Sequence, residues 1–210
     1  MISKLQYISQ ETPQLSHLQA IEQACQAGCD WIQLRMKDCS FEQYRVVARE
    51  AQKICEGYHA QLIINDNVEV AQDVKAYGVH LGKEDMRPSE ARKRLGERII
   101  IGGTANTFDD IQRLHGEGVD YIGLGPLRFT TTKKKLSPVL GLKGYRNILD
   151  QMHKASIVLP VVAIGGVRLV DVPELRQCGV FGIAVSGLIT HAENKKAVVD
   201  SLFDKLSEEA

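Results

Sequence analysis

Three side chains with polar or charged ends alternate along one short run of this sequence. Gln33, Arg35 and Lys37 are separated by Leu34 and Met36. In a β-strand this spacing places the first three on one face and the two apolar residues on the other. Two cations on one inward face are costly to bury unless an anion accompanies them. The run therefore predicts a phosphate or pyrophosphate site, with a pair of surface cations as the alternative.

Two carboxylates follow two later strand-like runs. Asp66 comes directly after the run 61–65, and Asp85 lies four residues after the run 79–81. If these strands are parallel neighbours, about 4.8 Å apart, the two carboxylates can meet at one edge of the sheet. Carboxylate oxygens next to a phosphate are typical surroundings of Mg²⁺. The pair predicts a magnesium site; the alternatives are a helix cap for Asp66 and a solvated loop charge for Asp85.

A long segment, 125–141, carries hydroxyl groups and cations together. It contains three threonines and three lysines in succession at 130–135. Long loops of this kind often close over active sites. The segment suits a polyphosphate, and a solvated basic loop is the alternative.

Small residues end the last two strand-like runs. Gly165 and Gly166 follow the run 161–164, and Ser186 follows the run 181–185. Glycine allows a phosphate to approach backbone amides closely. These positions predict a second anion site, without a metal, so the chain would take two phosphorylated substrates or one large one.

Other catalytic patterns are weak in this sequence. No Ser-His-Asp or Cys-His nucleophile motif is evident. His80 and His115 are interpreted as a packing residue and a helix-surface residue.

These residues need a scaffold that gathers strand ends from the whole chain. Eight β-rich runs each precede a helical segment: 5–8, 31–37, 61–65, 79–81, 99–101, 121–124, 161–164 and 181–185. Such alternation favours parallel strands joined by helices. Eight units predict an α/β fold, a closed (β/α)₈ TIM barrel, whose sites lie at the C-terminal ends of the strands. An open doubly wound sheet is the alternative, but no G-x-G-x-x-G follows the first strand.

Composition excludes several classes of protein. Lys plus Arg equals Asp plus Glu at 26 each, which does not favour nucleic acid as a partner. The longest apolar stretch, 157–164, is far shorter than the ~20 residues of a membrane span. No apolar signal core is evident near the N-terminus, and the five cysteines form no CxxC pair. We expect one cytoplasmic domain over 1–210 with small-molecule substrates and no membrane partner, compatible with a homo-oligomer.

In their order, the motifs of this chain resemble those of the thiamine phosphate synthase family. They are Gln33 to Lys37, Ile64 to Asp66, Gly78 to Gly82, Gly125 to Lys133, and Ala163 to Gly166. The match extends from about Leu5 to Ser207. The resemblance implies a (β/α)₈ barrel that joins 4-amino-2-methyl-5-(diphosphooxymethyl)pyrimidine to 4-methyl-5-(2-phosphooxyethyl)thiazole. The products are thiamine phosphate and pyrophosphate, and the mechanism implied is dissociative.

The resemblance also implies roles for individual residues. Catalytic cations would hold the pyrophosphate: Arg35, Lys37 and Lys133. Mg²⁺ would be bound by two carboxylates: Asp66 and Asp85. Substrate would contact seven further residues: Gln33, Asn65, Thr104, Thr130, Thr132, Gly166 and Ser186. Of these, Gln33 and Thr104 would lie near the pyrimidine, and Gly166 and Ser186 near the thiazole phosphate.

Four positions depart from the usual pattern of the family. Thr104 replaces a serine, Asn106 a histidine and Lys83 a glutamine, and Arg128-Phe129 replaces an aromatic-proline pair. Two other functions remain as alternatives to the synthase. One is a thiazole tautomerase, which would use a histidine near position 106; the other is a non-catalytic sensor of a phosphorylated ligand. Pyrophosphate release distinguishes the synthase from both.

Overall fold

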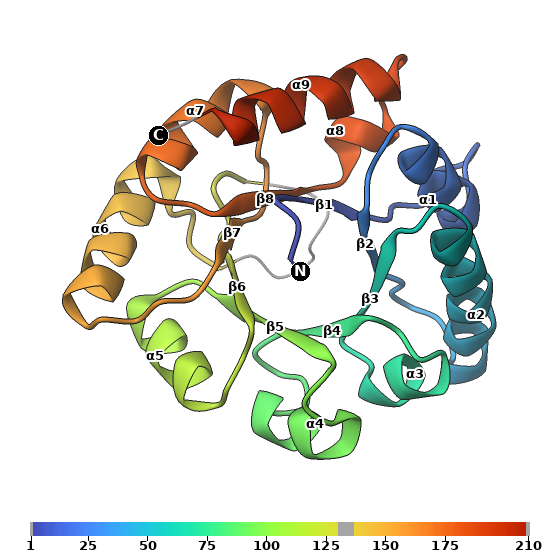
Figure 1. Cartoon of the computed structure of the whole chain (residues 1–210), viewed down its shortest axis with the longest axis horizontal. Coiled ribbons are helices and arrows are strands. Elements are labelled where there is room, and N and C mark those ends of the chain that lie inside the picture. The colour runs from blue at the N-terminus through green and yellow to red at the C-terminus, as the bar shows by residue number, and fades with distance from the viewer. Residues whose placement is uncertain (1, 130–136, 209–210) are drawn as a thin grey trace.

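In a computed structural model, parallel strands close into a ring with helices around its outside (Figure 1). The structure describes residues 2–129 and 137–208. The strands are β1 (Leu5–Ile8), β2 (Trp31–Leu34), β3 (Gln61–Asn65), β4 (Gly78–Leu81), β5 (Ile100–Ala105), β6 (Tyr121–Leu124), β7 (Val161–Ala163) and β8 (Gly182–Val185). Each strand pairs with the next, and β8 pairs with β1. The predicted (β/α)₈ barrel is confirmed, and the open sheet is excluded.

The helices follow the strands around the ring, and several of them begin where the sequence provides a cap. They are α1 (His17–Gln26), α2 (Phe41–Gly57), α3 (Val68–Asp73), α4 (Pro88–Leu95), α5 (Phe108–Gly116), α6 (Gly141–Lys154), α7 (Val172–Gln177), α8 (Gly187–Thr190) and α9 (Lys195–Ser207), with the 3₁₀ turn η1 (Leu169–Asp171). Ser16, Ser40 and Thr107 form capping boxes at α1, α2 and α5. None of the helices in the described part of the chain has the length and hydropathy of a membrane span.

Two layers of apolar residues hold the barrel together. The inner layer fills the barrel below its mouth: Trp31, Ile63, Tyr121, Val162 and Ala184. The outer layer packs the strands against the helices, and Ile32 and Leu34 belong to it. The alternation expected along 31–37 is therefore confirmed for 31–34, because Trp31 faces inward while Ile32 and Leu34 face the helices.

The second strand is shorter than predicted. It ends at Leu34 rather than at position 37. The Arg35 amide donates a hydrogen bond to the Ser9 hydroxyl, at 3.1 Å. Arg35 and Lys37 consequently belong to the loop after β2. The fifth strand is longer than predicted, because β5 continues to Ala105, and the short helix α8 was not predicted.

Candidate active site

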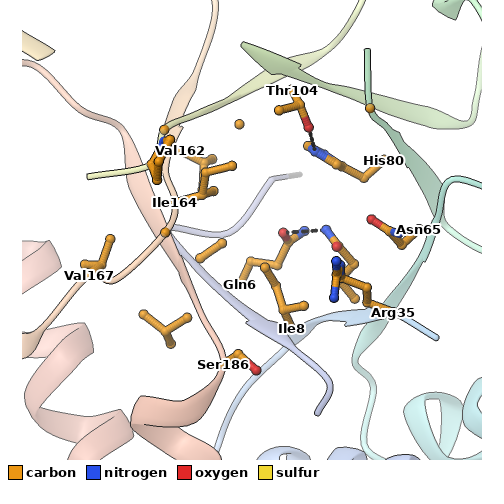
Figure 2. Close-up of a pocket in the computed structure, with 18 of the residues that line it drawn as sticks. Gln6, Ile8, Arg35, Asn65, His80, Thr104, Val162, Ile164, Val167 and Ser186 are labelled. Carbon is orange, nitrogen blue, oxygen red and sulfur yellow. Dashed lines mark hydrogen bonds between the residues drawn. The ribbon is translucent and has the colours of Figure 1, made fainter. Parts of the chain in front are cut away.

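A cavity of about 710 Å³ lies at the C-terminal ends of the strands (Figure 2). Its lining includes eight of the residues predicted from the sequence: Gln33, Arg35, Lys37, Asn65, Asp66, Thr104, Gly166 and Ser186. Asp85 lines an adjoining hollow that shares Lys37, Asn65 and Asp66 with this cavity. Three predicted residues lie outside the described part of the chain: Thr130, Thr132 and Lys133.

The two carboxylates predicted to bind a metal are in contact. Asp66 and Asp85 share a side-chain hydrogen bond, and Asp85 also accepts one from the Gly82 amide at 2.7 Å. Burial, the hydrogen bond with Asp66 and repulsion from Asp66 raise the pKa of Asp85 to about 6. Burial opposes ionisation of Asp66 too, but hydrogen bonds with Asp85 and Lys37 outweigh it and lower the pKa of Asp66.

Asp66 is positioned by its backbone and does not cap the following helix. Its φ of 65° lies in the left-handed region, which aspartate tolerates better than most residues. The cap of α3 is Asn67, whose side chain accepts a hydrogen bond from the Val70 amide at 2.9 Å. The alternative reading of Asp66 as a helix cap is therefore wrong, and its carboxylate is left to pair with Lys37.

The carboxylates of Asp66 and Asp85 form a donor set that fits a magnesium ion. Two facing carboxylates repel each other unless a proton or a cation lies between them, and this repulsion adds to burial in raising the pKa of Asp85. Both offer the hard oxygen ligands that Mg²⁺ prefers. No group of three or more His, Cys, Asp or Glu side chains suited to a metal occurs among the described residues. Two protein carboxylates together with water and substrate phosphate would match the usual coordination of Mg²⁺.

A tyrosine of α2 connects the ends of the two strands that precede Lys37 and Asp66. The Tyr44 hydroxyl donates a hydrogen bond to the Leu34 carbonyl (2.8 Å) or to the Asn65 carbonyl (2.9 Å), and it accepts one from the Asn65 amide at 3.2 Å. The ends of β2 and β3 are thereby held together. The loops that carry Lys37 and Asp66 start from these two ends.

The opposite side of the cavity is formed after β7 and β8. Gly165 and Gly166 have φ angles of 80° and 72°, which side chains other than glycine rarely adopt. A Cβ atom on Gly165 would lie 2.6 Å from the Pro126 Cβ. Ser186 donates its hydroxyl to the Gln10 side chain at 3.1 Å. This side lets a ligand approach the backbone and has no carboxylate pair of the kind found beside β3 and β4.

Comparison with known proteins agrees with this geometry. A family model described as thiamine monophosphate synthase matches residues 5–189. The chain belongs to the thiamine monophosphate synthase family. A thiamine-phosphate synthase of Flavobacterium johnsoniae is 52% identical over 206 residues, which cover 98% of this chain and 97% of the relative. One of Bacteroides fragilis is 53% identical over 188 residues, with 90% and 92% covered.

A solved structure of a related protein has a similar fold. Thiamine phosphate pyrophosphorylase from Pyrococcus furiosus superposes with a TM-score of 0.82 at 29% identity, covering 97% of this chain and 95% of that one. A 3-hexulose-6-phosphate synthase, at 14% identity and a TM-score of 0.69, shares the fold alone. The family expected from the motifs is confirmed, and with it the expected transferase activity of a synthase.

All four departures from the family pattern have structural partners here. Asn106 donates to the Gly125 and Pro138 carbonyls, each at 2.9 Å, and so joins both described ends of the long loop to β5. Lys83 forms an ion pair with Asp110 at 2.5 Å, so its charge is already neutralised. The fourth, Thr104, keeps the hydroxyl of the serine that it replaces, and this hydroxyl lies 2.9 Å from Nε2 of His80.

The third departure is the first residue of the Arg128-Phe129 pair. Arg128 forms a two-pronged ion pair with Asp171, of which the Nη2–Oδ1 distance is 2.5 Å, and it donates to the Gly166 carbonyl at 3.1 Å. The described start of the long loop is thus attached to the loop after β7. Phe129 itself is 73% exposed.

Sequence analysis missed three polar residues inside this synthase-family barrel. Gln6 and His80 line the cavity, and Tyr121 is fully buried among them. His80 is buried, as its interpretation as a packing residue requires, but it also hydrogen-bonds Thr104 at 2.9 Å. One signal was available for Gln6, because it is a polar residue at an inward position of an otherwise apolar strand. His115 is exposed on α5, as expected.

Proposed function

We propose that this chain joins the pyrimidine diphosphate to the thiazole phosphate at the C-terminal mouth of the barrel and releases pyrophosphate. One observation supports the assignment above others: the cavity and the hollow that adjoins it have cations and paired carboxylates on one side, and the cavity has a glycine-rich edge on the other. Two phosphorylated substrates need two anion sites. A volume of about 710 Å³ lies within the usual range of ligand cavities.

In the proposed reaction the bond between the pyrimidine methylene carbon and the pyrophosphate oxygen breaks first. Its electron pair leaves with the pyrophosphate, and the aminopyrimidine stabilises the methylene cation. The thiazole nitrogen then donates its lone pair to that carbon, which forms the new C–N bond of thiamine phosphate. No nucleophile of the protein is required, so catalysis consists of positioning and charge stabilisation.

Cationic side chains would stabilise the negative charge that develops on the leaving pyrophosphate. Arg35 and Lys37 line the cavity beside Asp66, and we assign the same role to Lys133. Asp66 and Asp85 would hold Mg²⁺, which when bound adds positive charge against the leaving group. On binding, Lys37 would exchange its pairing with Asp66 for the pyrophosphate.

The remaining predicted residues would position the two rings. We assign Gln33, Asn65 and Thr104 to the pyrimidine diphosphate, because they line the side of the cavity formed by β2, β3 and β5. Gly166 and Ser186 would hold the thiazole phosphate. The segment that contains Thr130 and Thr132 would close over both substrates, as the family resemblance implies.

The direct test is pyrophosphate release from the purified chain. We expect release only when both substrates and Mg²⁺ are present, with thiamine phosphate formed in equal amount. Omission of either substrate or chelation of the metal is the control. Binding of the thiazole phosphate without any pyrophosphate release would contradict the proposal and favour a tautomerase or a sensor.

The proposed setting of the enzyme is the cytoplasm. All five cysteines are free thiols in the structure, which is typical of proteins in a reducing compartment. The proposed partners are the two small-molecule substrates. One domain, comprising residues 1–210, would carry the whole reaction.

A further inference from the structure

Five polar side chains form a continuous line of hydrogen bonds across the inside of the barrel. The Gln33 amide donates to Gln6 at 3.0 Å, and the Gln6 amide donates to the Tyr121 hydroxyl at 3.4 Å. That hydroxyl lies 2.9 Å from Nδ1 of His80, and Nε2 of His80 lies 2.9 Å from the Thr104 hydroxyl. Figure 2 shows the first and last of these hydrogen bonds as dashed lines, at Gln6 and between His80 and Thr104.

The interior of the barrel leaves space for these five side chains. Gln6, Gln33 and Tyr121 are at most 2% exposed. A Cβ atom on Gly102 would lie 2.1 Å from the Tyr121 ring, and one on Gly123 would lie 2.8 Å from the His80 ring. These two glycines therefore provide the space that the two rings occupy, and no other residue type fits there without displacing a ring.

The two glutamine amides set the direction of the first two bonds in the line. Gln6 can only donate through its nitrogen, so the Tyr121 oxygen is an acceptor in that bond. The single hydroxyl proton of Tyr121 is then free to point at Nδ1 of His80. Burial raises the pKa of Tyr121, which keeps this proton in place. When that proton points at Nδ1, Nδ1 is an acceptor, and the proton of a neutral imidazole lies on Nε2.

The last bond of the line decides what Thr104 offers to a ligand. With a proton on Nε2, His80 donates to the Thr104 oxygen. No other hydrogen bond uses the Thr104 hydroxyl proton among the residues that the structure describes. Thr104 lines the cavity, so this proton can point to a ligand there.

We infer that the line of hydrogen bonds holds His80 as the neutral Nε2–H tautomer and so makes Thr104 a hydrogen-bond donor to the pyrimidine diphosphate. His80 and Tyr121 are then positioning residues, which act on substrate through Thr104. The opposite direction of the line would place the histidine proton on Nδ1 and turn the Thr104 proton away from the cavity. Thr104 would then present only lone pairs to a substrate rich in oxygen and nitrogen acceptors. The identity of the ligand rests on the proposed function, whereas the tautomer does not.

Nitrogen NMR of the full chain without substrate tests the tautomer directly. In ¹⁵N-histidine-labelled protein at about pH 8, above the usual histidine pKa of about 6.5, we expect His80 to show a protonated Nε2 and an unprotonated Nδ1. His80→Asn assigns the signals. Tyr121→Phe keeps the ring but removes the proton directed at Nδ1, and should yield a mixture of tautomers. An Nδ1–H tautomer, an imidazolium, or His80 signals unchanged by Tyr121→Phe would overturn the inference.

Kinetics tests the consequence at Thr104. Thr104→Val should lower kcat/KM for the pyrimidine diphosphate about tenfold, the scale of one lost hydrogen bond, and leave KM for the thiazole phosphate unchanged. Thr104→Ser, which keeps the hydroxyl, should retain the kcat/KM of the unchanged chain. His80→Gln, whose side-chain nitrogen can reach the Nε2 position, should retain more activity than His80→Asn. Equal rates in Thr104→Val and the unchanged chain would contradict the role of Thr104, and the NMR result would still stand if pyrophosphate release were absent altogether.

Discussion

At the scale of single residues, the partner of a charged group decides its role. Lys37 and Lys83 both follow strands and both form ion pairs at the mouth of the barrel. Lys37 pairs with Asp66, which faces the cavity, whereas Lys83 pairs with Asp110 at the cap of α5. Hydrogen bonds from Lys83 and from the Asn106 and Thr107 amides outweigh burial and lower the pKa of Asp110. The extra cation at position 83 therefore leaves the carboxylate pair of Asp66 and Asp85 undisturbed.

The first prediction concerns that carboxylate pair. Asp66→Asn should reduce pyrophosphate release at least about a hundredfold, the scale on which one electrostatic contact to a transition state is lost, because it removes one proposed ligand of Mg²⁺. The measurement is turnover as a function of Mg²⁺ concentration. Glu84→Gln is the matched control, since Glu84 is an exposed carboxylate next to Asp85. Unchanged turnover in Asp66→Asn would remove Asp66 from the metal site.

At the scale of elements, helices hold the strand ends through buried tyrosines. Tyr44 of α2 bonds to the ends of β2 and β3, and Tyr145 of α6 donates to the Leu124 carbonyl at the end of β6. Both tyrosines are buried. Burial raises the pKa of each, so each hydroxyl keeps its proton. The loops of the site thus start from anchored ends.

The second prediction follows from the Tyr44 anchor. Tyr44→Phe should lower the free energy of unfolding by about 1–2 kcal/mol, because it removes one buried hydroxyl and leaves carbonyls unsatisfied. It should also weaken the response to Mg²⁺, since the loop with Asp66 starts at β3. Tyr58→Phe is the control: Tyr58 is 41% exposed and makes a surface bond to Gln26. Urea unfolding gives the stability, and equal effects of the two substitutions would count against the anchor.

The third prediction concerns the ion pair between Arg128 and Asp171. Burial alone would raise the pKa of Asp171, but hydrogen bonds from Arg128 and from the Arg168 amide lower it. A carboxylate with a lowered folded-state pKa stabilises the fold above its unfolded-state pKa of about 3.9, and that stability is lost as pH falls through the folded-state value. Asp171→Asn should therefore lower the free energy of unfolding by about 1–3 kcal/mol at neutral pH and by progressively less in acid.

Urea unfolding at a series of pH values measures this effect. Asp200→Asn is the control, because Asp200 forms an exposed pair with Lys196 on α9 and such pairs contribute little. A difference between Asp171→Asn and the unchanged chain that does not depend on pH would argue against the ion pair as its cause.

At the scale of the whole molecule, closure of the barrel separates the two proposed anion sites. The carboxylates follow β3 and β4, and the glycine-rich edge follows β7 and β8, which lie across the ring in Figure 1. Among the residues 2–129 and 137–208, a carboxylate pair suited to a metal lines the first proposed site and not the second. In the proposed reaction the two substrates would therefore approach each other across the barrel mouth, each held by different chemistry.

The fourth prediction separates the sites by their need for metal. Chelation of Mg²⁺ should weaken binding of the pyrimidine diphosphate at least about tenfold, since the metal would neutralise its charge, and change binding of the thiazole phosphate by less than about twofold. Isothermal titration with each substrate, with and without a chelator, measures both. An equal loss of affinity for the two substrates would mean that they share one metal-dependent site.

Much of the site could be predicted from the order and the alternation of residues. The period-two pattern placed Gln33 on an inward face, and strand order brought Asp66 and Asp85 together. The end of β2 could not be predicted, because the Ser9 hydroxyl competes with strand pairing at Arg35. That competitor is 26 residues away in the chain and becomes a neighbour only when β1 lies beside β2.

The sequence by itself determined the (β/α)₈ architecture and the family, since alternation, capping residues and short motifs are local properties of the chain. Tertiary structure alone decided which buried polar groups meet inside the barrel. Gln6 and Tyr121 are 115 residues apart, and His80 and Tyr121 are 41 apart, yet they share hydrogen bonds inside the barrel. Such contacts depend on strand register and on the space left by Gly102 and Gly123, which arise only when the barrel closes.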